Sequence, residues 1–221
     1  MPLPALATKS GTLVRDGIYI IANLKADLET ADLVEVVAPD QAALKKQMAV
    51  RTDTDTTAIE ASAVADARLN ALKRSIVHLG TRAFGFYLSR KADGYLRLLP
   101  QSPSQIIGLP VAQRTVAFDR LKKAAQAAET PKELGPTVKE LVAAYDAFTG
   151  AAATDKTADE ALRAALALEK KAVDAWHTAV RRLRGRLIDR FPRDSKRVGT
   201  YFPKGAAKVE KVVKVEGPGP A

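Results

Sequence analysis

The segment LRAALALEKKAVDAWHTAVRRLRGRL, residues 162–187, has large apolar residues at the spacing of one helix face. These residues are Leu162, Leu166, Val173, Trp176, Val180, Leu183 and Leu187. An α-helix turns once every 3.6 residues, so positions three or four apart form one stripe that faces a core. The helix is expected to begin near Thr154 or Asp155, either of which can cap it, and to end before Pro192. We expect Trp176 to be a core residue of this helix.

A second stripe precedes it in the chain, at Leu69, Leu72, Ile76, Leu79, Ala83 and Phe86. This helix is expected to end near Arg90, before Gly94. Its start has two candidates. Pro39 and Asp40 form one start signal, and the polar run TDTDTT at residues 52–57 forms another. Residues 40–91 therefore form either one long helix or two.

Weaker stripes complete the pattern. Val14, Ile18, Ile21, Leu24 and Leu28 predict a first helix, in which Gly17 is a mild interruption. Residues 116–128 and 134–148 are helical, and the Gly135-Pro136 pair either kinks one helix or separates two. Residues 92–110 contain three prolines and predict an irregular connector with a short extended piece.

These segments predict an all-α fold, an elongated antiparallel four-helix bundle in which the apolar stripes face inward. A shift of 104 positions places Leu69, Leu72, Ile76 and Leu79 on Val173, Trp176, Val180 and Leu183. The bundle is then two copies of a helical hairpin, unless the alignment is incidental to any pair of amphipathic helices. Residues 1–204 are expected to form a single domain, and residues 205–221 a flexible C-terminal tail.

The composition excludes several classes of protein. The chain has no cysteine, so disulfides and thiolate metal sites are excluded. Aromatic residues make up 5% of the chain, which favours closely packed helices over a β-sandwich. The N-terminus lacks the pattern of a signal peptide, and no apolar run approaches the roughly 20 residues of a membrane span. We expect a cytoplasmic protein that does not enter a membrane.

Catalytic and ligand-binding motifs are not found in the sequence. The two histidines, His78 and His177, are far apart and are expected at the surface or boundary of helices. No nucleophile, phosphate-loop or metal-ligand pattern is present. The sequence therefore predicts a non-catalytic protein without a metal or cofactor.

The positive charge is concentrated near the end of the chain. Of a formal net charge of +10, residues 181–204 contribute nine basic and two acidic residues. The candidate residues for binding a polyanion or another partner are Arg181, Arg182, Arg184, Arg186, Arg190, Arg193, Lys196 and Arg197. In the four-helix bundle this basic segment lies at one pole, while the acidic residues 27–66 and 129–160 lie at the other.

Two functions follow from this charge map. The first is a structural or protein-interaction module, which could self-associate head to tail through its oppositely charged poles. The alternative is a non-specific nucleic-acid or polyanion binder that uses the basic pole. Aromatic residues close to the basic residues, such as Tyr201 and Phe202, could stack on nucleobases or could pack the end of the chain back onto the bundle.

Overall fold

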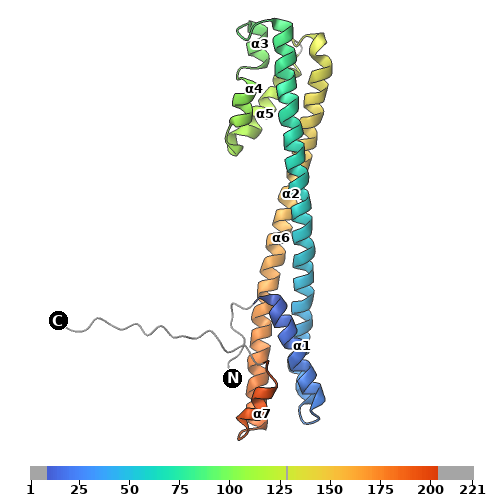
Figure 1. The fold of residues 1–221 in the computed structure, drawn as a ribbon, viewed down its shortest axis with the longest axis vertical. Helices are drawn as coiled ribbons and strands as arrows, with labels where there is room; N and C mark the ends of the chain where they lie inside the picture. The colour runs from blue at the N-terminus through green and yellow to red at the C-terminus, as the bar shows by residue number, and fades with distance from the viewer. Residues whose placement is uncertain (1–8, 128, 204–221) are drawn as a thin grey trace, which may run out of the picture. The chain divides into compact units, whose positions relative to one another are not determined.

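The computed structural model describes residues 9–127 and 129–203, and within these residues the regular structure is entirely helical. The all-α prediction is therefore confirmed for this part of the chain. Figure 1 shows the helices along the chain. The chain divides into two compact units. Unit 1 comprises residues 1–55 and 162–221, and unit 2 comprises residues 56–161. The single domain at residues 1–204 stays a prediction, and the predicted tail at 205–221 lies outside the described residues.

Two long helices contribute to both units. α2 spans Ala38–Tyr87 and α6 spans Gly135–Arg190. Residues 40–91 were expected to form either one long helix or two, and α2 shows a single helix here. In unit 1 the two helices are antiparallel neighbours, because Gln41 contacts Trp176 whereas Arg51 contacts Glu169.

The predicted start of a helix at Thr154 or Asp155 is wrong, since α6 runs through this region without a break. The hydroxyls of Thr149, Thr154 and Thr157 do not cap a new helix. Each donates to the carbonyl four residues earlier, at 2.7, 3.1 and 3.0 Å. Threonine bonded in this way stays inside a helix, and the alanines around it favour helix formation. The segments predicted to begin at residues 134 and 154 therefore belong to one helix, and the predicted four-helix bundle is not confirmed.

Short helices occupy the regions between the long ones. Before α2 lie α1 (Ser10–Ala26) and the 3-10 helix η1 (Ala31–Val36); between the long helices lie α3 (Asp93–Leu98), α4 (Pro103–Gly108), α5 (Val111–Ala125) and η2 (Lys132–Leu134); α7 (Ser195–Thr200) follows α6. The extended piece predicted at 92–110 is wrong, because Ser102 caps α4 through a reciprocal capping box with Gln105. The predicted helices at 116–128 and 134–148 correspond to two separate helices, and Gly135-Pro136 begins the second of them, α6.

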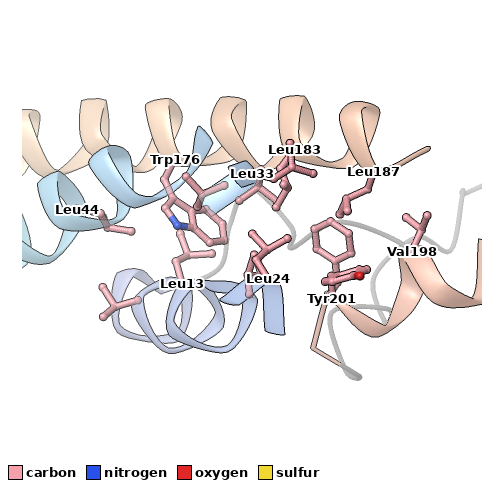
Figure 2. Packing of buried hydrophobic residues seen from close by; sticks show 14 of the residues in the cluster. Leu13, Leu24, Leu33, Leu44, Trp176, Leu183, Leu187, Val198 and Tyr201 are labelled. Atoms are coloured by element: carbon pink, nitrogen blue, oxygen red, sulfur yellow. The ribbon is translucent and has the colours of Figure 1, made fainter. Parts of the chain in front are cut away.

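The core of unit 1 surrounds Trp176 (Figure 2). The indole is fully buried, which confirms the prediction for this residue. It lies among leucines of α1, α2 and α6, namely Leu13, Leu24, Leu44, Leu183 and Leu187. Val198, Tyr201 and Phe202 belong to the same cluster, so the aromatic pair after α6 staples the chain onto the core.

The core of unit 2 is built in the same way from the end of α2, the start of α6 and the short helices α3 to α5. Its largest fully buried side chains are those of Leu72, Ile76, Leu79, Leu99, Phe118 and Leu141. Phe118 packs edge-on against Phe148 with ring centroids 6.2 Å apart. Such an edge-to-face pair adds a favourable electrostatic contribution to the burial of the two rings.

The two units contain similar elements. In each, a helix and a 3-10 turn lead into the start of one long helix, and the end of the other long helix is followed by a short helix. In both, a threonine hydroxyl donates to the carbonyl six residues earlier, from Thr30 to Leu24 at 3.2 Å and from Thr130 to Ala124 at 3.3 Å. The residues paired by the 104-position shift also agree in burial, as in Ile76 and Val180. These agreements favour a duplicated arrangement over an incidental alignment.

At the N-terminal part of the predicted stripe, around residues 162–172, the inward face of α6 consists of other residues. Leu166 is 48% exposed, whereas Ala165, Glu169 and Ala172 are buried. These three and Trp176 alternate spacings of four and three residues, the repeat typical of paired long helices. The prediction considered only large apolar residues and so missed the alanines. Small side chains at these positions allow two helix backbones to approach closely.

Candidate polyanion interface

The predicted binding residues all lie in unit 1, on the last turns of α6 and on the segment that leads through α7. Arg181, Arg182, Arg186, Arg190, Arg193 and Lys196 are exposed, and Arg184 and Arg197 are half-buried. The structure separates them into two groups. Arg190 and Arg197 form ion pairs within unit 1, whereas the others have no carboxylate within 4.0 Å among the described residues.

Arg190 is bound to η1 by a bidentate ion pair. Its Nη1 lies 2.6 Å from Asp32 Oδ1 and its Nη2 lies 2.9 Å from Asp32 Oδ2. Nη1 also donates to the backbone carbonyl of Glu29. Parallel hydrogen bonds of this kind fix the orientation of a guanidinium group. Arg190 therefore joins the end of α6 to the segment that precedes α2.

Arg197 holds α7 against the same acidic segment. Its Nη2 lies 2.7 Å from Asp27 Oδ2 and 2.5 Å from Glu29 Oε2, and its guanidinium lies 3.9 Å from the centre of the Phe191 ring. The hydroxyl of Tyr201 also donates to Asp27. Hydrogen bonds from Arg197 and Tyr201 lower the pKa of Asp27 from its ordinary 3.8 to about 2.

These contacts correct the predicted distribution of charge. The acidic end of the first helix was expected at the pole opposite the basic end of the last helix. Instead, Asp27, Glu29 and Asp32 neutralise Arg190 and Arg197 inside unit 1. The error came from the four-helix topology, which placed the two segments at opposite ends of a bundle.

The arginines without ion pairs extend into a larger basic surface on α6. At about 100° per residue, Arg163, Lys170, Lys171, Arg181 and Arg182 lie on the side of the helix away from Trp176. All five are exposed. We call these residues, with the flanking Arg184 and Arg186, the basic face. Asp174 is the acidic residue on this side of α6 between Arg163 and Arg186.

Three members of the basic face, Arg163, Lys170 and Lys171, were not identified from the sequence. They lie outside the dense arginine run, and only their angular position relative to the core of α6 connects them with Arg181 and Arg182. From Arg163 to Arg186 the face extends about 35 Å along the helix, at about 1.5 Å per residue. This is similar to one turn of duplex DNA, about 34–36 Å.

The histidines occupy different environments. His78 is exposed, with Nδ1 2.9 Å from Glu140 Oε2. His177 was expected at the surface or a boundary, and this is wrong, because the residue is 4% exposed and its Nε2 has no hydrogen-bond partner within the described structure. Burial lowers the pKa of His177, and the charge of Arg181 lowers it further.

Other features limit what unit 1 presents to a ligand. Tyr201 and Phe202 are 3% and 4% exposed, so their rings are not available for stacking on nucleobases. Across residues 9–127 and 129–203, no group of three or more histidine or carboxylate side chains is arranged to hold a metal ion. No described helix has a stretch long and apolar enough to cross a membrane.

Comparisons of the chain with protein-family models, curated proteins and solved structures found no match.

Proposed function

We propose that this chain is a non-catalytic, cytoplasmic helical protein that binds nucleic acid non-specifically through the basic face of α6. The observation that carries the proposal is the contrast between two groups of arginines. Arg190 and Arg197 are neutralised by carboxylates of unit 1, whereas the basic face has no such partners among the described residues. Exposed arginine and lysine side chains along one face attract a phosphate backbone and displace its counterions.

The geometry of the face supports phosphate contacts that are independent of base sequence. Its arginines and lysines lie along one helix over about 35 Å, which is about the length of one duplex turn. Lysine and arginine bound to phosphates carry no sequence information by themselves. About five such contacts would reduce the affinity about 500-fold between ~50 and ~200 mM salt.

The test measures binding of the full chain to a labelled duplex and a labelled single strand at these two salt concentrations. The variant Arg163→Gln/Lys170→Gln/Arg181→Gln/Arg182→Gln removes four exposed charges from the basic face. A matched control removes four exposed charges from unit 2, at Arg68, Arg74, Arg82 and Lys91. Both variants have the same net charge, so a difference between them reports position rather than total charge.

We expect the basic-face variant to bind much more weakly and with a shallower salt dependence than the control. Equal losses in both variants would show that binding depends only on net charge and would refute the proposed face. No binding at ~50 mM salt would remove the nucleic-acid function altogether.

Self-association through charged poles, and a wider role as a protein-interaction module, remain a second hypothesis. The charge of Asp27, Glu29 and Asp32 is already paired within unit 1, so less acidic charge is available to a second copy. Sedimentation at ~50 and ~200 mM salt tests this hypothesis, since association through opposite charges weakens as salt screens them. A salt-independent monomer would exclude it.

A further inference from the structure

Unit 2 contains a cavity of about 670 Å³ between the short helices that precede α6. Its walls are mainly apolar and include Ile106 of α4, the adjoining Leu109, and Val116 and Leu121 of α5. Cavities that bind small molecules have volumes of about 300–1,000 Å³, apolar walls and a few placed polar groups. The cavity therefore has the size and lining of a small-molecule site.

The walls are held in place by contacts that do not depend on a ligand. Pro103, at the start of α4, packs at Gly80 of α2 so closely that a Cβ at residue 80 would lie 2.4 Å from the proline ring. The guanidinium of Arg114 donates from Nε and Nη2 to the carbonyl of Leu109, at 3.2 and 2.9 Å, and so fixes the corner between α4 and α5. A preformed cavity loses little entropy when a ligand enters.

Two arginines are among the residues that line the cavity. They are Arg97 and Arg120, and Gln113 lines it as well. Arg120 has no carboxylate partner among the described residues, and Arg97 is paired with Glu129 at 3.0 Å. The Arg97–Glu129 pair is largely exposed, with side-chain exposures of 71% and 74%, so an incoming anion can replace Glu129.

We propose that this cavity binds a small amphipathic acid, with its hydrocarbon chain against the apolar walls and its carboxylate at Arg97 and Arg120. The planar fork of an arginine matches a carboxylate, and two arginines at one apolar cavity favour an anionic head over a neutral one. The apolar chain replaces water on walls such as Leu109 and Val116. This site is independent of the nucleic-acid function proposed for unit 1.

The test is isothermal titration of the full chain with octanoate and, separately, with its neutral counterpart octanamide. Arg97→Gln/Arg120→Gln should weaken octanoate binding about tenfold or more and leave octanamide binding nearly unchanged. Arg74→Gln/Arg82→Gln is the matched control, because it removes two exposed charges of unit 2 that do not line the cavity. Glu129→Gln should tighten octanoate binding about two- to fivefold, because it frees Arg97.

A further variant separates occupation of the cavity from attraction at the surface. Val116 lines the cavity and is 51% exposed, so Val116→Trp can fill the cavity without entering the core. It should abolish binding of both octanoate and octanamide, while its circular dichroism and melting temperature stay close to those of the unmodified chain. The proposal is overturned by any of three results: no 1:1 binding of octanoate at ~1 mM, octanamide binding as tightly as octanoate, or octanoate affinity unaffected by Arg97→Gln/Arg120→Gln.

Discussion

The indole Nε1 of Trp176 donates to the amide Oε1 of Gln41 at 2.6 Å, in the buried core of unit 1. The amide nitrogen of Gln41 in turn donates to the carbonyl of Val14 at 2.7 Å. One glutamine thus satisfies the indole and connects α6, α2 and α1. Gly17 provides the space for this amide, because a Cβ at that position would lie 1.8 Å from Gln41 Oε1.

We therefore predict that Gly17→Ala destabilises the protein even though alanine is the better helix former. The added methyl group must displace the Gln41 amide, which strains the core and leaves the buried indole N–H without its acceptor. The expected loss is about 1–3 kcal/mol in the free energy of unfolding, measured by urea denaturation. Gly11→Ala in the same helix is the control, since its Cβ would meet its nearest neighbour at 4.0 Å. That variant should gain up to about 1 kcal/mol. Equal effects of the two variants would contradict the role of Gly17.

A second polar contact, between a buried carboxylate and a partly exposed arginine, joins α2 and α6 in unit 1. Arg51 Nε lies 3.2 Å from Glu169 Oε2, with side-chain exposures of 33% and 9%. Arg51 occupies the same seven-residue repeat as the buried Val37 and Leu44. A polar pair at an inward position disfavours other alignments of two helices, in which each charge would be buried alone.

We predict that Arg51→Leu destabilises the chain more than the double variant Arg51→Leu/Glu169→Leu. The single variant leaves the Glu169 carboxylate buried without its cation, and we expect a loss of about 2 kcal/mol because Arg51 is partly exposed. The double variant replaces the ion pair with apolar contacts and should recover the stability of the unmodified chain or exceed it. Chemical denaturation of both variants measures the difference. A double variant less stable than Arg51→Leu would show that the leucines do not pack in this seam.

How far the sequence predicts this protein depends on whether a feature is local. The stripes around Ile76 and Val180 predicted the cores of both units, because helical spacing and burial are linked within a few turns. The threonines near residue 154 did not show whether a helix begins there. A threonine hydroxyl can cap a helix or bond within one, and only the path of the backbone distinguishes the two cases.

The candidate site shows a different limit. Arg190 and Arg181 are indistinguishable in the sequence, yet Arg190 is bound to Asp32 and Arg181 is not. Arg190 is neutralised because residues 27–32 pack against the end of α6. This contact joins segments that are far apart in the sequence, so no local pattern predicts it. In contrast, the position of Arg163 on the basic face can be predicted from the sequence. With Trp176 as the centre of the inward face, about 100° per residue places Arg163 on the opposite side of the helix.

The pairing of Asp27 predicts a dependence of stability on acid pH. Hydrogen bonds from Arg197 and Tyr201 lower the pKa of this carboxyl from 3.8 to about 2 in the folded chain. The stabilisation is therefore complete above about pH 4 and is lost as the pH falls towards 2. Asp27→Asn should remove this part of the acid dependence, measured as the denaturation midpoint against pH. Tyr201→Phe removes one of the donors to Asp27 and should give an intermediate curve, and an Asp27→Asn curve parallel to the original would contradict the assignment.

The buried His177 predicts a second pH dependence in a higher range. Burial and the charge of Arg181 lower its pKa below the ordinary 6.5 in the folded chain, with Asp174 opposing them. Below about pH 6.5 the unfolded chain takes up a proton that the folded chain resists, so the free energy of unfolding falls as the pH decreases. One such group limits the slope to about 1.4 kcal/mol per pH unit. His177→Leu should flatten the curve between about pH 7 and 5, whereas His78→Gln, at an exposed position, should retain the slope contributed by His177. If His177→Leu keeps the original slope, the buried imidazole is not the group that titrates.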